Sequence, residues 1–271
     1  MVTRRIPHFD LAQIAESGQC FRLNREGPNW RLIAHGKVLQ MRQHGETVQF
    51  LCTQKAFEEI WRGYFDLDTD YGTFLASPAP DDSYLAGAAA YGSGIRILRQ
   101  DPWETLVTFL LSQRKNISAI RSAVEALCTR FGKPIHRGKE TFYAFPTAKT
   151  LARCSPEDLS ACSLGYRVPY VADAAKKVAC GALDLPSLNG LDNDALQEAL
   201  LRIHGVGIKV ASCVALFGYH RLDCFPRDVW INRVLETHYG GRFDPLRYKG
   251  FAGVIQQYLF YYARNEKIDH R

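Results

Sequence analysis

The stretch that decides the fold reads LLRIHGVGIKVASC and runs from Leu200 to Cys213. Apolar residues at helical spacing flank Gly205 and Gly207, and two glycines around one apolar residue permit a tight turn and a close backbone approach. The stretch therefore predicts a helix, a glycine-flanked hairpin and a second helix. The N-terminus of that second helix would present free N–H groups and the positive end of the helix dipole, which suit a DNA phosphate contacted without regard to base sequence.

Lys209 falls within the first turn of the predicted second helix. A cation at this end opposes the helix dipole, and partial burial would add to that effect, so the neutral amine is favoured there. A neutral amine is a nucleophile. An exposed helical lysine is ordinarily a solvated side chain, but the position of Lys209 argues against that interpretation.

Asp228 stands directly before an apolar helical run in the segment FPRDVWIN, residues 225–232. It is a natural N-cap, and the N–H groups that it satisfies would also keep the carboxylate ionised. A glycosidic bond breaks through an oxocarbenium-like state, so a fixed carboxylate can stabilise the sugar while an amine attacks its anomeric carbon. Lys209 and Asp228 are therefore the predicted catalytic pair, and attack by Lys209 would leave a Schiff base.

Elements outside this stretch follow from the hydrophobic periodicity. Three short apolar runs separated by turn signals predict antiparallel strands at residues 30–33, 38–41 and 48–51. From Phe57 onward the apolar residues fall at helical spacing. Helix starts are marked at Asp101-Pro102, at the capping-box-like Ser155 to Asp158, and at Asp192 or Asn193.

This order of elements predicts an α+β fold. We expect a mainly α-helical bundle with a helix-hairpin-helix motif, plus a small N-terminal antiparallel β domain. The expected division is a β-rich domain with following helices at residues 1–95 and a helical domain at residues 96–271, to both of which the N-terminal segment can contribute.

The composition is that of an ordinary globular protein, with 46% hydrophobic and 23% charged residues among 271. The apolar runs are too short to cross a bilayer, and the N-terminus shows no export signal. A formal net charge of +6 favours a polyanionic partner, which alone is a weak signal. The eight cysteines form no C-x-x-C pair, so we expect reduced, buried thiols rather than a zinc or iron–sulfur site.

The G-V-G-x-K pattern ending at Lys209, with Asp228 downstream, resembles the helix-hairpin-helix (HhH-GPD) DNA glycosylase superfamily in residue type and spacing. Its members with this lysine are bifunctional glycosylases with β-lyase activity at apurinic or apyrimidinic sites. The opening segments FDL, residues 9–11, and SGQCFR, residues 17–22, are similar to the 8-oxoguanine DNA glycosylase branch, and the likeness covers most of the chain. The resemblance implies a base excision repair enzyme that flips 8-oxoguanine from duplex DNA and excises it through a lysine Schiff base.

The resemblance also implies a base-binding set. The carbonyl of Gly18 would meet the proton that 8-oxoguanine carries on N7 and guanine lacks, and a buried carbonyl that faces a lone pair instead loses its hydrogen bond. Cys213 lies one helical turn after Lys209, and Gln256 and Phe260 share one face of the last helix. A thiol and a phenyl ring can sandwich a flipped purine, and a glutamine can meet its Watson–Crick edge.

The implied DNA-binding residues lie in four segments. Tyr166 would fill the gap left in the duplex and Arg167 would contact the orphaned cytosine. The remaining implied contacts are Arg114, Lys115 and Asn116 in a loop that enters the helix at the lesion, Gly205 and Gly207 in the hairpin, and the indole N–H of Trp230.

The sequence departs from the family pattern at three places. Gln113, Arg114 and Lys115 replace an asparagine-rich loop, and Trp230 stands where a phosphate-contacting histidine is expected. Ala119 occupies the place of an arginine that contacts the opposite cytosine, which puts strict cytosine specificity in doubt.

Two alternatives remain open. A non-catalytic helix-hairpin-helix DNA-binding protein would use Lys209 as one more cation, but this leaves Asp228, Gly18 and Cys213 unexplained together. A glycosylase for another damaged base keeps the chemistry, and the segment at residues 17–22 argues against it.

We expect no dissociable cofactor and no metal bound by side chains, although the hairpin carbonyls of residues 203–206 could hold a structural cation. The expected partner is double-stranded DNA containing an oxidised purine, with no membrane association. We expect a monomer, located in the cytoplasm with the nucleoid in a bacterium or in the nucleus of a eukaryote.

Overall fold

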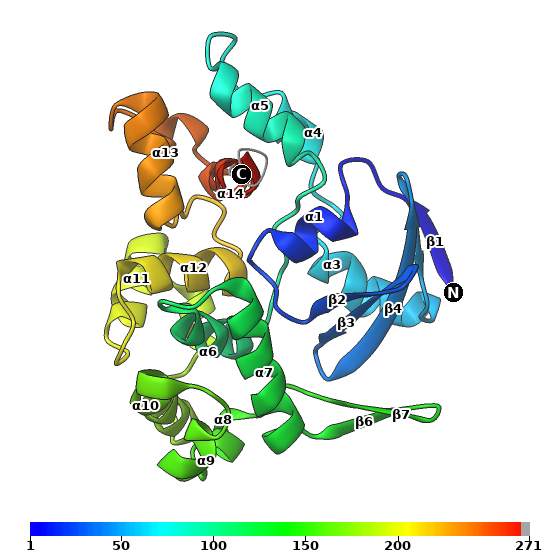
Figure 1. Ribbon diagram of the computed structural model, residues 1–271, viewed down its shortest axis with the longest axis vertical. Coiled ribbons are helices and arrows are strands. Elements are labelled where there is room, and N and C mark those ends of the chain that lie inside the picture. The colour runs from blue at the N-terminus through cyan, green and yellow to red at the C-terminus, as the bar shows by residue number, and fades with distance from the viewer. Residues whose placement is uncertain (267–271) are drawn as a thin grey trace.

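The computed structural model describes residues 1–266. An antiparallel sheet lies on one side of the molecule and most of the helices lie on the other, with α14 in the middle (Figure 1). The predicted α+β class, with a small N-terminal antiparallel sheet and a helical remainder, is confirmed.

The N-terminal sheet has five strands in the order β1-β5-β4-β3-β2. The three predicted strands are its centre, and two further strands pair at its edges. Leu32 and Leu39 are paired and fully buried, so one face of the sheet carries its core. The bounds are β1 (Val2–Arg5), β2 (Leu23–Glu26), β3 (Asn29–Ala34), β4 (Lys37–His44) and β5 (Thr47–Phe50).

Apart from α1, the helices follow the large sheet from Gln54 onward, and three of their starts agree with the predicted signals. Asp101 accepts from the backbone N–H of Glu104, Ser155 and Asp158 form a complete capping box, and Asp192 rather than Asn193 is the third N-cap. The helices are α1 (Leu11–Glu16), α2 (Gln54–Ala56), α3 (Arg62–Tyr64), α4 (Tyr71–Leu75), α5 (Ser83–Tyr91), α6 (Pro102–Ser112), α7 (Ile117–Phe131), α8 (Ala148–Leu151), α9 (Pro156–Ser160), α10 (Val168–Ala179), α11 (Asn193–Leu201), α12 (Ile208–Gly218), α13 (Val229–Tyr239) and α14 (Ala252–Glu266). A π-helical turn (Phe57–Trp61) joins α2 to α3, and short 3-10 turns span Gly165–Arg167, Ser187–Gly190 and Pro245–Tyr248.

A second, two-stranded sheet interrupts the helices and was not predicted. Its strands are β6 (Pro134–Arg137) and β7 (Glu140–Tyr143), and the hairpin extends from the end of α7 below the large sheet (Figure 1). The guanidinium of Arg137 donates to the carbonyls of Val38 and Leu51, at 3.3 and 3.5 Å. The hairpin therefore ties the helical part to the large sheet.

The buried apolar side chains form two clusters. The smaller one joins the large sheet to α1 and the helical run at residues 54–65, and the larger one fills the space between the remaining helices. Helices α4 and α5 contribute to the larger cluster, where α5 packs against α14. The expected boundary between residues 95 and 96 stays a prediction.

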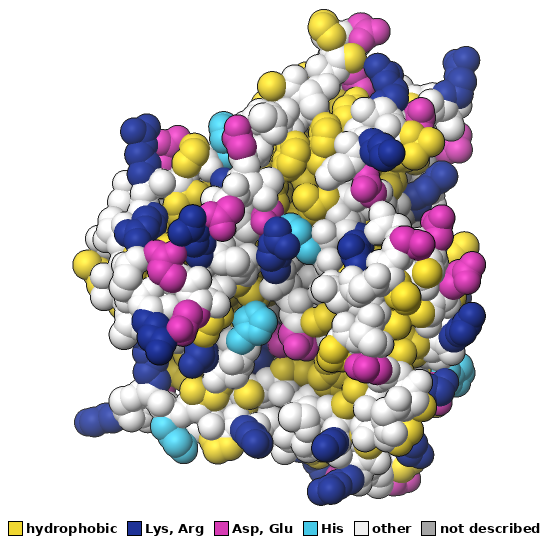
Figure 2. Space-filling view, turned by 180° about the vertical axis from the view of Figure 1, so that it is seen from behind, with side chains coloured by type: hydrophobic (Ala, Val, Ile, Leu, Met, Phe, Trp, Pro, Cys, Tyr) yellow, Lys and Arg dark blue, Asp and Glu magenta, His cyan; other side chains and the backbone are white. Residues whose placement is uncertain are grey.

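The surface seen from behind carries mixed charges. Figure 2 shows Lys and Arg side chains intermingled with Asp and Glu side chains over the described residues of this face. Within residues 1–266, each helix is too short or too polar to cross a membrane.

Candidate active site

The hairpin between α11 and α12 is built around Gly205. Its φ of +82° lies in the left-handed region, and a Cβ at this position would fall 2.4 Å from Cγ of Tyr170. Gly207 then caps α12 with an extended backbone and brings no side chain over the first N–H groups of the helix. Such N–H groups can bind a phosphate, and the predicted contact of the hairpin with DNA stays a prediction.

Lys209 and Asp228 come from the starts of two different helices. Lys209 is half-buried in the first turn of α12, and its Nζ lies 5.2 Å from the centroid of the Phe109 ring. Asp228 is the N-cap of α13, where its Oδ1 accepts from the backbone N–H groups of Trp230 at 3.0 Å and Ile231 at 2.9 Å. Both bonds use the same oxygen, so the cap fixes the carboxylate, and within residues 1–266 Oδ2 has no hydrogen bond.

One pocket collects the two predicted catalytic residues and all the predicted base-binding residues. Its lining includes Lys209 and Asp228 with Gly18, Cys213, Gln256 and Phe260. The cavity measures about 40 Å³, which is room for a few water molecules, so a flipped base would enter only as the side chains move apart. The pocket opens onto a groove of about 800 Å³, because the two share Gly18, Lys209, Asp228 and Phe260.

Gly18 forms one wall of the pocket. It follows α1 closely, has a φ of +77°, and a Cβ there would lie 3.2 Å from the Phe260 ring. Residues 1–266 place no hydrogen-bond donor against its carbonyl oxygen, so this acceptor is available to a ligand. Gly18 is thus required both by the backbone conformation and by the close approach of Phe260.

A second wall is the face of α12 that carries Cys213. Burial raises the pKa of the Cys213 thiol, and the nearby Asp228 carboxylate acts in the same direction, while the Lys209 amine opposes them. The thiol therefore stays protonated and serves as a small apolar surface.

The groove holds the predicted loop residues Arg114, Lys115 and Asn116, together with Trp230. Asn116 also caps α7 by accepting from the backbone N–H of Ala119 at 2.8 Å. Lys115 donates to the carbonyl of Ser163, and burial lowers the pKa of its ammonium group.

Tyr166 and Arg167 lie beside the groove rather than in its lining. Tyr166 is 51% exposed, as a side chain that fills a gap in a duplex would need to be. Arg167 is 4% exposed; it donates to the carbonyls of Gln113 and Leu164, and its guanidinium stacks on the Tyr166 ring. In this structure Arg167 therefore fixes the turn, and its contact with an orphaned cytosine stays a prediction.

Gln113 links that turn to the hairpin. Its Nε2 donates to the carbonyl of Gly205 at 3.0 Å, while its own carbonyl accepts from Arg167. The Ile203 carbonyl accepts from the backbone N–H of Val206 at 3.0 Å, so two hairpin carbonyls already have partners. The predicted structural cation at residues 203–206 stays a prediction.

Two adjoining family models together match residues 1–247 of the chain. Residues 1–106 match the 8-oxoguanine DNA glycosylase N-terminal domain, and residues 107–247 match the HhH-GPD superfamily of base excision DNA repair proteins. The chain belongs to the HhH-GPD superfamily.

Known HhH-GPD relatives extend over most of the chain. A protein named probable N-glycosylase/DNA lyase from Methanothermobacter thermautotrophicus is 29% identical over 97% of this chain and 97% of its own. The N-glycosylase/DNA lyase of Saccharomyces cerevisiae is 30% identical over 84% of this chain and 68% of its own. The 8-oxoguanine glycosylase/lyase of Clostridium acetobutylicum, solved with double-stranded DNA containing cytosine opposite 8-oxoguanine, is 33% identical, covers 97% of this chain and 94% of its own, and has a TM-score of 0.91.

Several residues of this HhH-GPD pocket were missed by sequence reasoning. Phe217 continues the spacing of Lys209 and Cys213 along α12 and could have been found by it. Gln257 donates to Oε1 of Gln256 at 3.0 Å from the neighbouring position. Asn232 and Arg264 likewise lie four residues after Asp228 and Phe260, whereas Phe109 comes from α6 and no spacing in the sequence points to it.

Proposed function

We propose that this protein is a bifunctional 8-oxoguanine DNA glycosylase and AP lyase of base excision repair. One observation carries the proposal: an amine, a capped carboxylate and an available backbone carbonyl, those of Lys209, Asp228 and Gly18, line the same small pocket. The pocket lies at the side of a groove that holds basic side chains and opens near the α12 N-terminus. The relatives named N-glycosylase/DNA lyase support the same activity.

The chemistry follows from this pair. As the glycosidic bond breaks, its electron pair leaves with the base, and the Asp228 carboxylate stabilises the positive charge that develops on the sugar. The Lys209 amine bonds to the anomeric carbon, and loss of its proton with opening of the sugar ring gives a Schiff base. The protonated Schiff base is an iminium that accepts electrons and so makes the C2′ proton acidic. Removal of that proton breaks the bond from C3′ to the 3′ phosphate oxygen, which expels the phosphate and nicks the strand.

Recognition of the base uses the two walls of the pocket. The Gly18 carbonyl would accept the N7 proton of 8-oxoguanine, and Cys213 and Phe260 would cover the faces of the purine. The buried amide of Gln256 lies where it could meet the Watson–Crick edge. Guanine would place a lone pair against the Gly18 carbonyl, which costs that carbonyl its hydrogen bond.

The groove is the proposed surface for duplex DNA. Arg114 and Lys115 supply positive charge along it, and the open N-terminus of α12 supplies backbone N–H groups. A single chain furnishes both the amine and the carboxylate of the pocket, which supports action as a monomer.

Base release from defined duplexes tests this function. The protein is incubated with duplexes that carry 8-oxoguanine opposite each of the four bases and with a matched undamaged G·C duplex, and free base is measured by mass spectrometry. We expect release of 8-oxoguanine but not guanine, with a relaxed preference for cytosine because Ala119 replaces the arginine of the family. Binding without release would support the non-catalytic alternative, and release of a different damaged base would overturn the substrate assignment.

A further inference from the structure

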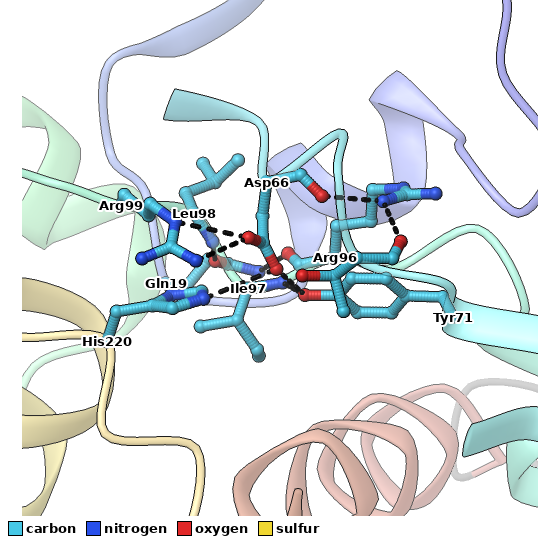
Figure 3. Close-up of polar contacts among 9 residues, drawn as sticks. Gln19, Asp66, Tyr71, Arg96, Ile97, Leu98, Arg99 and His220 are labelled. Atoms are coloured by element: carbon cyan, nitrogen blue, oxygen red, sulfur yellow. Dashed lines mark hydrogen bonds and ion pairs between the residues drawn. The ribbon is translucent and has the colours of Figure 1, made fainter. Parts of the chain in front are cut away.

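A buried carboxylate, that of Asp66, faces His220, which follows the C-terminal end of α12 (Figure 3). Asp66 is 2% exposed; its Oδ1 accepts from the guanidinium of Arg99 at 2.8 and 3.1 Å, and its Oδ2 accepts from the Tyr71 hydroxyl at 3.0 Å. The Nε2 of His220 lies 3.2 Å from Oδ2. Burial alone would raise the pKa of Asp66, but His220 and Arg99 outweigh it and hold the pKa well below its usual range, so the carboxylate stays ionised.

On one side, these contacts lead to the Gly18 wall. Gln19 is buried next to Gly18, and its side chain donates to the carbonyl of Arg96 at 2.9 Å and accepts from the backbone N–H of Leu98 at 2.8 Å. The same extended segment, residues 96–100, donates from the Ile97 N–H to the Tyr71 hydroxyl that binds Asp66. Segment 96–100 is therefore bound both by Asp66, through Arg99 and Tyr71, and by Gln19, the neighbour of Gly18.

On the other side, the contacts lead to the α12 wall. Lys209, Cys213 and Phe217 line the pocket from this helix, and His220 follows its last residue closely. The backbone N–H of Gln100 donates to the carbonyl of Phe217 at 3.1 Å, which already joins segment 96–100 to α12. The contact between Asp66 and His220 is a second attachment beyond the end of the helix.

The backbone at this second attachment is unusual at both partners. Asp66 has a φ of +51° and His220 a φ of +54°, in the left-handed region that residues other than glycine seldom adopt. Such conformations persist where surrounding contacts hold them, and they occur often at functional sites. Because both residues are left-handed and their side chains are in contact, we infer that this contact helps to hold the two backbone conformations.

We propose that Asp66 is a positioning residue of the base pocket: it joins His220 at the end of α12 to the segment that supports Gly18, and so sets the separation of the two pocket walls. This inference rests on the proposed function. Because a flipped base must touch both walls at once, the separation matters for base excision. An abasic site has no base to place between Gly18 and Cys213, so attack by Lys209 on it is largely independent of that separation.

The first test removes only the attachment to α12. His220→Gly deletes the imidazole and tolerates the positive φ without strain. We expect the single-turnover rate of 8-oxoguanine excision to fall about tenfold, while borohydride trapping on a pre-formed abasic site stays within twofold of wild type. His220→Gln retains a polar side chain whose amide can face Asp66, and it is expected to recover most of the excision rate.

A second variant tests whether the two residues act together. Asp66→Asn leaves a single carbonyl acceptor for three donors, and we expect the Asp66→Asn/His220→Gly double variant to be no slower than the slower single variant. Asp82→Asn is the matched control, because Asp82 also accepts from a tyrosine hydroxyl, that of Tyr239 at 3.0 Å, but lies away from the pocket. Its excision rate should stay within twofold of wild type.

The outcomes separate this inference from the proposed function. Unchanged excision in His220→Gly, an equal fall of excision and abasic-site trapping, or multiplying effects in the double variant would each overturn the positioning role. Absence of 8-oxoguanine excision by the wild-type protein would instead overturn the proposed function.

Discussion

The backbone of Gly205 approaches the ring of Tyr170 so closely that a Cβ on Gly205 would lie 2.4 Å from it. Gly205→Ala must therefore shift the hairpin or α10 as well as strain the φ of +82°. We expect the variant to be destabilised by about 2–4 kcal/mol and to bind duplex DNA more weakly, as measured by urea unfolding and fluorescence anisotropy.

Gly181→Ala is the control for that prediction. Gly181 has a similar φ of +80°, but a Cβ there would meet open space. It isolates the backbone cost, on the order of 1–2 kcal/mol, and should leave DNA binding unchanged. Equal effects of the two substitutions would show that the contact with Tyr170 contributes nothing.

Asp228→Asn separates the cap from the charge. Asparagine is as good an N-cap as aspartate, so the fold should be retained, but the sugar's developing charge loses its counterion. We expect excision of 8-oxoguanine to fall roughly 100-fold or more, while Lys209 still forms a trapped adduct with pre-formed abasic sites. Turnover of 8-oxoguanine at the wild-type rate would refute the catalytic role of Asp228.

Gly18→Ala tests the damaged-base contact. The methyl group would lie 3.2 Å from the Phe260 ring on a backbone that disfavours it, so the carbonyl must move. Loss of one hydrogen bond corresponds to roughly a tenfold slower excision of 8-oxoguanine, measured in single turnover against abasic-site cleavage by the same preparation. Gly27→Ala, with a φ of +59° and open space, should match wild type in both reactions. A parallel fall of both rates in Gly18→Ala would count against the contact.

Glu104 predicts a pH dependence of stability. Burial raises the pKa of this carboxyl from 4.5 to about 7, against the opposing effect of Arg22. Between pH 4.5 and about 7 the folded state therefore holds a proton that the unfolded state has released. The contribution of neutral Glu104 to the free energy of unfolding is fully present below pH 4.5 and is lost as the pH rises through about 7. Glu104→Gln should remove this loss, which amounts to at most about 1.4 kcal/mol per pH unit. Urea midpoints at pH 5.0, 6.0 and 7.5 measure it, and a difference from wild type that is constant across this range would contradict the assignment.

Local chemistry explains why much of the pocket could be predicted from the sequence. The spacing of Lys209 and Cys213 places them on one face of any helix, and Asp228 is recognisable as a cap before an apolar run. The resemblance supplied Gly18, Gln256 and Phe260, which the fold then brings to the same cavity.

The remaining features depend on contacts between distant segments. Phe109 reaches the pocket from α6, far from α12 in sequence, and Arg167 is buried because it finds the carbonyl of Gln113. Strand β1 was missed because its sequence, VTRR, has almost no apolar alternation and becomes a strand by pairing with β5. The network around Asp66 joins segments whose individual sequences carry no signal for it.

Borohydride trapping tests the central claim most directly. The wild-type protein and Lys209→Gln are each mixed with a duplex carrying 8-oxoguanine opposite cytosine, and the covalent protein–DNA adduct is measured after reduction. We predict an adduct for the wild type that is abolished in Lys209→Gln, while the variant still binds the duplex. An adduct of equal yield in Lys209→Gln, or none with the wild-type protein on any 8-oxoguanine pairing, would contradict it.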